Sequence, residues 1–273
     1  MKIVGLIAEY NPFHNGHLYH IRKAKEITGA DAVLVIMSGN YVQRGTPAIM
    51  PKHLRAQVAL ESGVAAVFEL PVCYATGSAE YFATGAVSLL NHLGCVDALC
   101  FGSECGDYAL LERIAGILTE EPEDYTFYLK EALRKGLSFP RARQQALSSY
   151  LKDENVDQVL DEPNILGIEY IKALYQTGSL IKGYTIQRKE SGYHDRDLSG
   201  NYSSASAIRR LLAQAGSSIH LRSDSIYDEP PLSDVLTRLE DQVPSACIDL
   251  LRDTHLIRYP VYANDFSLLL KYR

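Results

Sequence analysis

Two histidines, His14 and His17, lie on either side of Gly16 in the segment NPFHNGH at residues 11–17. Because they are three positions apart at the start of an expected helix, we expect both imidazoles to face the same side. Imidazoles in this position could donate hydrogen bonds to phosphate oxygens as charge develops on them. Gly16 would let a phosphate approach the backbone, where the free N–H groups of a helix N-terminus attract anions. The pattern predicts a site that does chemistry on a phosphate.

Other common phosphate-binding fingerprints are missing from the sequence. No G-x-G-x-x-G follows the first expected strand, and no G-x-x-x-x-G-K-[ST] occurs anywhere. A single histidine at a helix start is more often a cap or a surface residue, but two histidines around a glycine favour function. We therefore expect neither a P-loop nor a dinucleotide-binding fold of the usual kind.

Alternating strands and helices position this segment. Short apolar runs predict buried strands at 2–8 and 32–37 and two further strands at 64–70 and 96–101. Helical spacing of apolar residues predicts helices at 16–27, 51–62 and 78–93. This alternation predicts an α/β fold with a Rossmann-like parallel sheet, which binds ligands at the carboxyl ends of its strands. The two histidines follow the first strand and so lie at such an end.

The rest of the chain is mostly helical. We expect helices at 107–118, 124–135, 139–151 and 163–176, which together form a helical insert at about 107–176. A strand at 181–188 and helices at 204–214 and 232–252 follow. Ser, Asp and two prolines after residue 216 mark a boundary. The expected domains are a catalytic domain at 1–216 and a C-terminal helical segment at 217–273.

The charge balance limits the partners of the protein. Lys plus Arg is 27 and Asp plus Glu is 33, so the formal net charge of the 273 residues is −6. This argues against a globally basic nucleic-acid binder but leaves room for a local basic face. Arg134, Lys135, Arg141 and Arg143 surround Phe139 and could track a phosphate backbone while the aromatic ring stacks on a base. A charged helix surface without such a role is the alternative.

The cysteines and the apolar segments indicate the compartment. The chain has five cysteines, an odd number, which argues against a fold stabilised by disulfide bonds. A reducing cytoplasm is therefore the expected compartment. Their spacing is not that of a zinc site. No apolar run reaches the roughly 18 residues that span a bilayer, and Glu9 and Asn11 interrupt the N-terminal run. We therefore expect a cytoplasmic protein with no membrane partner.

The segment His14-Asn15-Gly16-His17 resembles the H-x-G-H signature of the nucleotidyltransferase superfamily, which includes class I aminoacyl-tRNA synthetases. Members of this superfamily act on the α-phosphate of ATP and release pyrophosphate. They pair H-x-G-H with a later serine–arginine motif, which SSASAIR at 203–209 resembles, although Ala205 replaces its second serine. The catalytic residues that the resemblance implies are His14, His17, Ser206 and Arg209. Ser206 and Arg209 would hold the leaving phosphates, whereas a plain N-cap is the alternative for this serine-rich start.

A wider resemblance covers most of the chain. The segments GLIAEYNPFHNGHLYH, MSGNYVQRGTPAI, FELPVCYATGSAEYFATGAVSLLN, CFGSE, PNILGIEYIKAL and SGYHD resemble the bacterial tRNA(Met) cytidine acetate ligase family, in nearly the same order and spacing. The resemblance implies that ATP activates acetate as acetyl-adenylate, which then acetylates N4 of the wobble cytidine of elongator tRNA(Met). Mg²⁺ is expected with the triphosphate. Members are usually longer at the C-terminus, so we expect truncation here to affect tRNA affinity more than the ATP site.

The same resemblance implies a set of substrate-binding positions. Those for ATP are Ile7, Ala8, Glu9, Tyr10, Asn11, Pro12, Phe13, His14, Asn15, Gly16, His17, Leu18, Tyr19, His20, Gly102, Asn164, Arg188 and Lys189. From the residues alone, Asn164 could equally be an N-cap, and Arg188 and Lys189 could be a solvated strand end. Arg44, Lys52 and Arg55 could face the phosphates or be surface charges. Arg141 and Arg143 are the residues that we expect to bind tRNA.

Two other functions fit the same residues. A small-molecule adenylyltransferase of the same superfamily would join AMP to a phosphorylated acceptor, and acetate-dependent pyrophosphate exchange would distinguish the ligase from it. A non-catalytic nucleotide- or RNA-binding module would bind ATP without releasing pyrophosphate. The helical insert favours the ligase over a compact transferase, and the presence of His14, His17 and Arg209 favours an enzyme.

Overall fold

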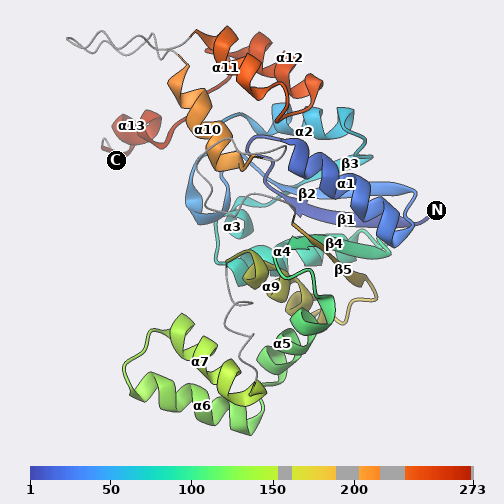
Figure 1. Cartoon of the computed structure of the whole chain (residues 1–273), viewed down its shortest axis with the longest axis vertical. Helices are drawn as coiled ribbons and strands as arrows, with labels where there is room; N and C mark the ends of the chain where they lie inside the picture. Colours follow the sequence, from blue (N-terminus) through green and yellow to red (C-terminus); the bar gives the residue numbers. More distant parts are fainter. Residues whose placement is uncertain (153–161, 189–202, 216–230, 272–273) are drawn as a thin grey trace.

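The computed structural model describes residues 1–152, 162–188, 203–215 and 231–271 (Figure 1). Within these residues a parallel sheet of five strands has the order β3-β2-β1-β4-β5. The strands are β1 (Ile3–Ala8), β2 (Ala32–Ser38), β3 (Ala66–Leu70), β4 (Ala98–Ser103) and β5 (Lys182–Gln187). The expected Rossmann-like α/β fold is confirmed.

The strand order reverses beside β1. The chain runs outward from β1 through β2 to β3, and then returns to place β4 and β5 on the other side of β1. In open parallel sheets such a switch point leaves a crevice at the carboxyl ends of the two strands, where ligands bind. The turn with His14 follows β1, and Gly102 lies near the end of β4. The topology therefore brings these two parts of the sequence to the same edge of the sheet.

Helices cover both faces of the sheet. One core joins β1 and β2 to the helices α1 (Asn15–Thr28), α2 (Lys52–Glu61), α10 (Ala205–Gln214), α11 (Leu232–Leu239) and α12 (Ser245–Thr254). The other core joins the opposite sheet face to α4 (Ala79–His92), α5 (Tyr108–Glu120) and α9 (Glu162–Gln176), with the short α3 (Val72–Ala75) beside α4. Within the described chain, no helix is both long and apolar enough for a bilayer span.

The helices expected between 107 and 176 are all present and share one core, but they divide into two pairs. α9 packs against α4 and β4, and α5 packs against α9, so both belong to the layer that covers the sheet. α6 (Glu123–Arg134) and α7 (Phe139–Leu151) pack against each other and project away from the sheet (Figure 1). We call this helical hairpin the arm.

The C-terminal part differs from expectation in one helix. The predicted single helix at 232–252 is wrong, because the chain forms α11 and α12 with a break at residues 240–244. Pro244 is the N-cap of α12, where its missing N–H breaks no helical hydrogen bond. Beyond α12 lie the short 3₁₀ turn Ala263–Phe266 and α13 (Ser267–Lys271). The expected domain boundary near residue 217 lies outside the described residues.

Candidate active site

His14 and His17 form the centre of the candidate site. His14 is the N-cap of α1, and its Nδ1 accepts the N–H of Gly16 at 3.1 Å. The Nδ1 of His17 accepts the N–H of His14 at 3.2 Å, and the two ring centroids lie 3.7 Å apart. Since both Nδ1 atoms are acceptors, a neutral ring carries its proton on Nε2. Each histidine therefore presents an Nε2–H donor at the N-terminus of a helix.

The environment keeps both rings neutral. Burial lowers the pKa of His14 to about 3, and the positive charges of Arg188 and Arg209 act in the same direction. Burial also lowers the pKa of His17 well below its usual value, and that of nearby His20 to about 4. Neutral imidazoles at physiological pH can donate hydrogen bonds to a phosphate without carrying a charge themselves.

Neighbouring residues hold these rings in place. The ring of His17 lies 4.8 Å from that of Tyr10 and 5.5 Å from that of Phe13, and both aromatic residues are buried. A Cβ at Gly16 would lie 2.8 Å from Cε1 of His14. The glycine thus makes room for the His14 ring, a role that is more specific than the expected approach of a phosphate to the backbone.

The serine–arginine motif at 203–209 contacts the same turn, although it lies much later in the sequence. Nη1 of Arg209 donates to the backbone oxygen of Asn11 at 2.6 Å, and Nη2 donates to Oγ of Ser206 at 3.0 Å. Ser204, whose Oγ accepts the N–H of Ala207 at 3.1 Å, is the N-cap of α10. Ser206 is therefore not the cap, and its hydroxyl lies with Arg209 beside the histidine turn.

The segment between α11 and α12 braces both parts of the site. The backbone N–H of Asn15 donates to the oxygen of Gln242 at 2.9 Å, and Nδ2 of Asn15 donates to the oxygen of Asp241 at 2.8 Å. Oε1 of Gln242 accepts the N–H of Ser203 at 3.0 Å. Gln242, which is buried, thus joins the start of α1 to the start of α10.

Asn164 lies in the first turn of α9, next to the turn that follows β4. It is not an N-cap, because α9 already begins at Glu162. Its Oδ1 accepts the N–H groups of Glu104 at 2.9 Å and Cys105 at 3.4 Å, and so holds the turn that follows β4. Its Nδ2 is buried without a partner among the described residues. A buried donor of this kind is costly unless a ligand or another group accepts from it.

Arg188 lies beside Gly102 at the same edge. A Cβ at Gly102 would lie 3.2 Å from Nε of Arg188, so the glycine leaves space for this side chain. The backbone N–H of Arg188 donates to the oxygen of Ser103 at 2.9 Å and extends the pairing of β4 with β5. Lys189, the next expected ATP-binding residue, lies outside the described residues.

Two basic residues that could have faced phosphates are engaged elsewhere. Arg55 is fully buried, and its guanidinium donates to backbone oxygens at the ends of β1 and β2 and in the loop before α2. Those acceptors are Glu9, Ser38, Gly39 and Met50. Lys52 pairs with the carboxylate of Glu69. The expectation that Arg55 is either a phosphate ligand or a surface charge is wrong, because it is a buried brace of the sheet edge.

Sequence patterns did not single out Tyr170, which lies close to the site. It is buried in α9, with its ring 5.7 Å from that of Phe101 at the end of β4. Burial raises the pKa of its phenol, which also lies within electrostatic reach of Glu9 and Arg188. Glu9 is itself part-buried, with Oε1 accepting the N–H of Gln43 at 2.9 Å and with its pKa raised by burial.

The structure separates the two arginines that we expected to bind tRNA. Arg141 is exposed on the arm, near Phe139, whose side chain is also exposed. Arg143 is mostly buried, and its Nη1 lies 3.4 Å from Oε1 of Glu169 in α9. The described residues contain no group of three or more histidine, cysteine or acidic side chains that could hold a metal ion.

Comparison with known families matches the whole chain to one of them. Residues 1–273 match the family model described as HIGH Nucleotidyl Transferase. A tRNA(Met) cytidine acetate ligase of Acetivibrio thermocellus is 46% identical over 269 residues, which are 97% of this chain and 61% of the relative. The enzyme of the same name from Clostridium perfringens is 52% identical over 221 residues, 78% of this chain and 55% of the relative. The chain therefore spans less than two thirds of the length of these curated relatives.

Solved structures agree with this family match. The crystal structure of apo TmcAL from Thermotoga maritima is 38% identical and superposes with a TM-score of 0.88, over 100% of this chain and 62% of that chain. TmcAL bound with alpha-thio ATP superposes with a TM-score of 0.84, over 100% of this chain and 61% of that chain. These matches confirm both the expected fold and the expected family resemblance.

Proposed function

Because the chain belongs to the HIGH nucleotidyl transferase family, we propose that it activates acetate with ATP and transfers the acetyl group to a cytidine of tRNA(Met). Relatives with 46% and 52% identity that carry the name tRNA(Met) cytidine acetate ligase support this choice of substrates. The observation that carries the proposal is the pair of neutral Nε2–H donors on His14 and His17, with the charge of Arg188 within electrostatic reach of both rings.

ATP would occupy the crevice beside β1 and β4. In this arrangement the segment Ile7–His20 surrounds the phosphates, and the α-phosphate accepts from Nε2 of His14 and His17. The unpartnered Nδ2 of Asn164 and the backbone near Gly102 would face the nucleoside. Support comes from the topology, which brings these segments to one edge of the sheet, and from the alpha-thio ATP that TmcAL binds.

The first step forms acetyl-adenylate. An oxygen of acetate attacks the α-phosphorus, and the bond from that phosphorus to the bridging oxygen of the leaving pyrophosphate breaks. The histidine donors stabilise the α-phosphate oxygens as charge shifts onto them. Arg209, held by Asn11 and Ser206, and Arg188 stabilise the negative charge on the departing pyrophosphate. Mg²⁺ would enter bound to the phosphates of ATP.

The second step forms the amide. N4 of the cytidine attacks the acetyl carbonyl carbon, the bond from that carbon to the AMP oxygen breaks, and N4 loses a proton. We propose that this cytidine is the wobble nucleotide of elongator tRNA(Met), and that the reaction takes place in the cytoplasm, where ATP and tRNA are available. Exposed Arg141 and Phe139 on the arm would contact the RNA.

Labelled acetate tests the proposal directly. The protein is incubated with ATP, labelled acetate and bulk tRNA, and the RNA is then digested so that the labelled nucleoside can be identified. We expect label in N4-acetylcytidine, together with acetate-dependent exchange of pyrophosphate into ATP, and loss of both in the His14→Ala/His17→Ala variant. Exchange that requires a phosphorylated small molecule and ignores acetate would contradict the proposal.

A further inference from the structure

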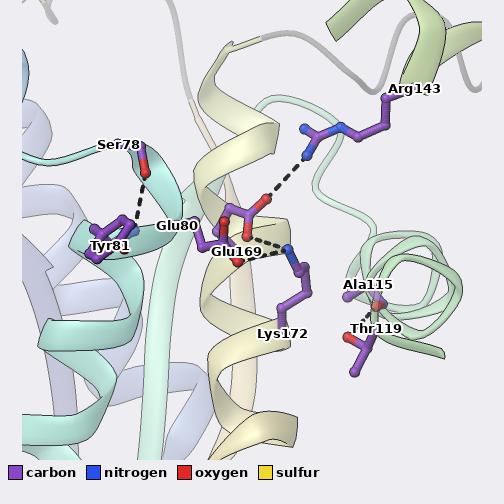
Figure 2. A network of polar contacts seen from close by, with 8 residues as sticks. All are labelled: Ser78, Glu80, Tyr81, Ala115, Thr119, Arg143, Glu169 and Lys172. Atoms are coloured by element: carbon purple, nitrogen blue, oxygen red, sulfur yellow. Dashed lines mark hydrogen bonds and ion pairs between the residues drawn. The ribbon is translucent and has the colours of Figure 1, made fainter. Parts of the chain in front are cut away.

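A network of charges around the buried side chains of Glu169 and Lys172 joins the arm to α9 (Figure 2). Glu169 is only 4% exposed, and its Oε2 lies 2.8 Å from Nζ of Lys172 on the same helix. Its Oε1 lies 3.4 Å from Nη1 of Arg143, which reaches across from α7. Nζ of Lys172 lies 3.8 Å from Oε1 of Glu80 at the start of α4. The network thus connects three helices, α4, α7 and α9.

Arg143 matters for the position of α7 more than for neutralising the charge of Glu169. Lys172 alone can pair with Glu169, since the two are three residues apart on one helix. Buried ion pairs add little net stability because desolvation offsets their attraction, but breaking one leaves an uncompensated charge. The contact of Arg143 with Glu169 therefore favours one position of α7 relative to α9 over others.

The position of Arg143 on α7 also separates it from the exposed face. Residues two apart on a helix point about 200° away from each other, because each residue turns by about 100°. Arg143 accordingly points toward Glu169 in α9, while Arg141 is exposed. The two arginines cannot present one continuous surface to RNA.

α9 connects this network to the candidate active site. Asn164, in the first turn of α9, holds the N–H of Glu104 after β4, and Glu169 follows five residues later. Five residues along a helix correspond to about 7.5 Å. The rigid helix α9 therefore fixes the position of the contact with α7 relative to the sheet edge at which Asn164 lies.

We propose that Arg143 is a positioning residue, whose ion pair with Glu169 sets the arm at the angle that presents RNA, bound through Arg141, to the activated acetyl group. This inference rests on the proposed function. It assigns Arg143 and Glu169 to the transfer step and leaves the adenylation step to the residues around His14 and His17.

The experiment compares Arg141→Ala, Arg143→Ala, Glu169→Gln and the double variant Arg143→Ala/Glu169→Gln in the full chain. The measurements are acetate-dependent pyrophosphate exchange, tRNA affinity at several salt concentrations, and kcat/KM for tRNA acetylation. Arg141→Ala should reduce the slope of log affinity against log salt by about one, the effect of losing one phosphate contact. Arg143→Ala and Glu169→Gln should keep the slope and the exchange rate but lower kcat/KM for acetylation by about tenfold.

The double variant separates a pair from two independent residues. If the ion pair acts as a unit, the double variant should be no worse than either single variant, and Arg143→Lys should recover much of the activity. Effects that multiply, or a salt slope that falls in Arg143→Ala as it does in Arg141→Ala, would overturn the inference. Equal loss of exchange and acetylation would overturn it too, because the network would then support the fold. Thermal unfolding of each variant identifies that case.

The control for the underlying function is the unmodified protein. If it supports acetate-dependent exchange but transfers no acetyl group to RNA, the RNA half of the proposed function fails, and with it this inference. If it acetylates RNA while the variants behave additively, only the role of Arg143 and Glu169 is refuted.

Discussion

The neutral state of the histidine pair can be tested by titrating the unliganded protein. Because burial and the charges of Arg188 and Arg209 lower the pKa of His14 to about 3, lowering the pH from 8 to 5 should leave its ring neutral. At pH 5 a group with that pKa is roughly 1% protonated, whereas an ordinary histidine is roughly 97% protonated. The backbone bonds to both Nδ1 atoms should keep the proton on Nε2 throughout.

The assay is ¹⁵N NMR of protein labelled at histidine, since the nitrogen shifts report both protonation and tautomer. His14→Asn and His17→Asn variants assign the two rings, and a denatured sample should titrate normally. We expect two rings that carry their proton on Nε2 at every pH between 8 and 5. A ring of the pair that titrates near pH 6.5 would refute the neutral-donor reasoning. A proton on Nδ1 would refute the orientation of the donors.

The lowered pKa values of the buried histidines also make the free energy of unfolding depend on pH. Folding lowers the pKa of His14 to about 3 and that of His20 to about 4. Between these values and about 6.5 the unfolded chain binds protons that the folded chain does not, so stability rises with pH. The contribution of these rings is complete above pH 6.5 and is lost as the pH falls toward 4. Urea unfolding at pH 7, 6 and 5 should show this decline, which His20→Asn should reduce.

Substitutions at four residues test the contacts around the site. Replacing His14 or His17 with Ala should slow acetyl-adenylate formation by about 10²-fold or more, the usual loss for one such donor, with a much smaller loss of ATP binding; near-normal pyrophosphate release in both would exclude the role. Gly16→Ala should slow the same step, because its Cβ would lie 2.8 Å from Cε1 of His14, and unchanged turnover would show that the ring has room to move. Gln242→Ala should cost about 1–3 kcal/mol of unfolding free energy in urea, since the N–H of Ser203 loses its acceptor. Gln242→Glu, which keeps an acceptor, is the matched control, and equal stability of both variants would contradict the bracing role.

Features that depend on local pattern could be predicted from the sequence. β1, β2 and β4 are apolar runs buried within the sheet, and the apolar residues of the helices recur with helical spacing in the sequence. The predicted helix at 78–93 is present as α4, which continues through Gly85, where a Cβ would lie 2.4 Å from the ring of Tyr74. The break at Pro244 was visible in the sequence, since proline cannot continue the hydrogen bonding of a helix.

Features that depend on distant partners could not be predicted. Arg55 looks like any helix-surface arginine until the ends of β1 and β2 come together around it. Asn164 has the sequence context of a cap, yet the N–H groups that donate to its Oδ1 lie 60 and 59 residues earlier. The partner of Arg143 was equally hidden, although the spacing of Arg141 and Arg143 on a predicted helix could have excluded a shared face.

The hydrogen bond from Arg209 to Asn11 joins residues that are 198 positions apart. A ribosome makes the histidine turn first, and at about 5–20 residues per second the arginine follows on the order of 10–40 s later. Gln242, which braces both helix starts, is made later still. During synthesis the emerging chain therefore holds the histidine turn without the groups that complete it. The order of translation therefore keeps the histidine turn incomplete until the segment that carries Arg209 and Gln242 has been made.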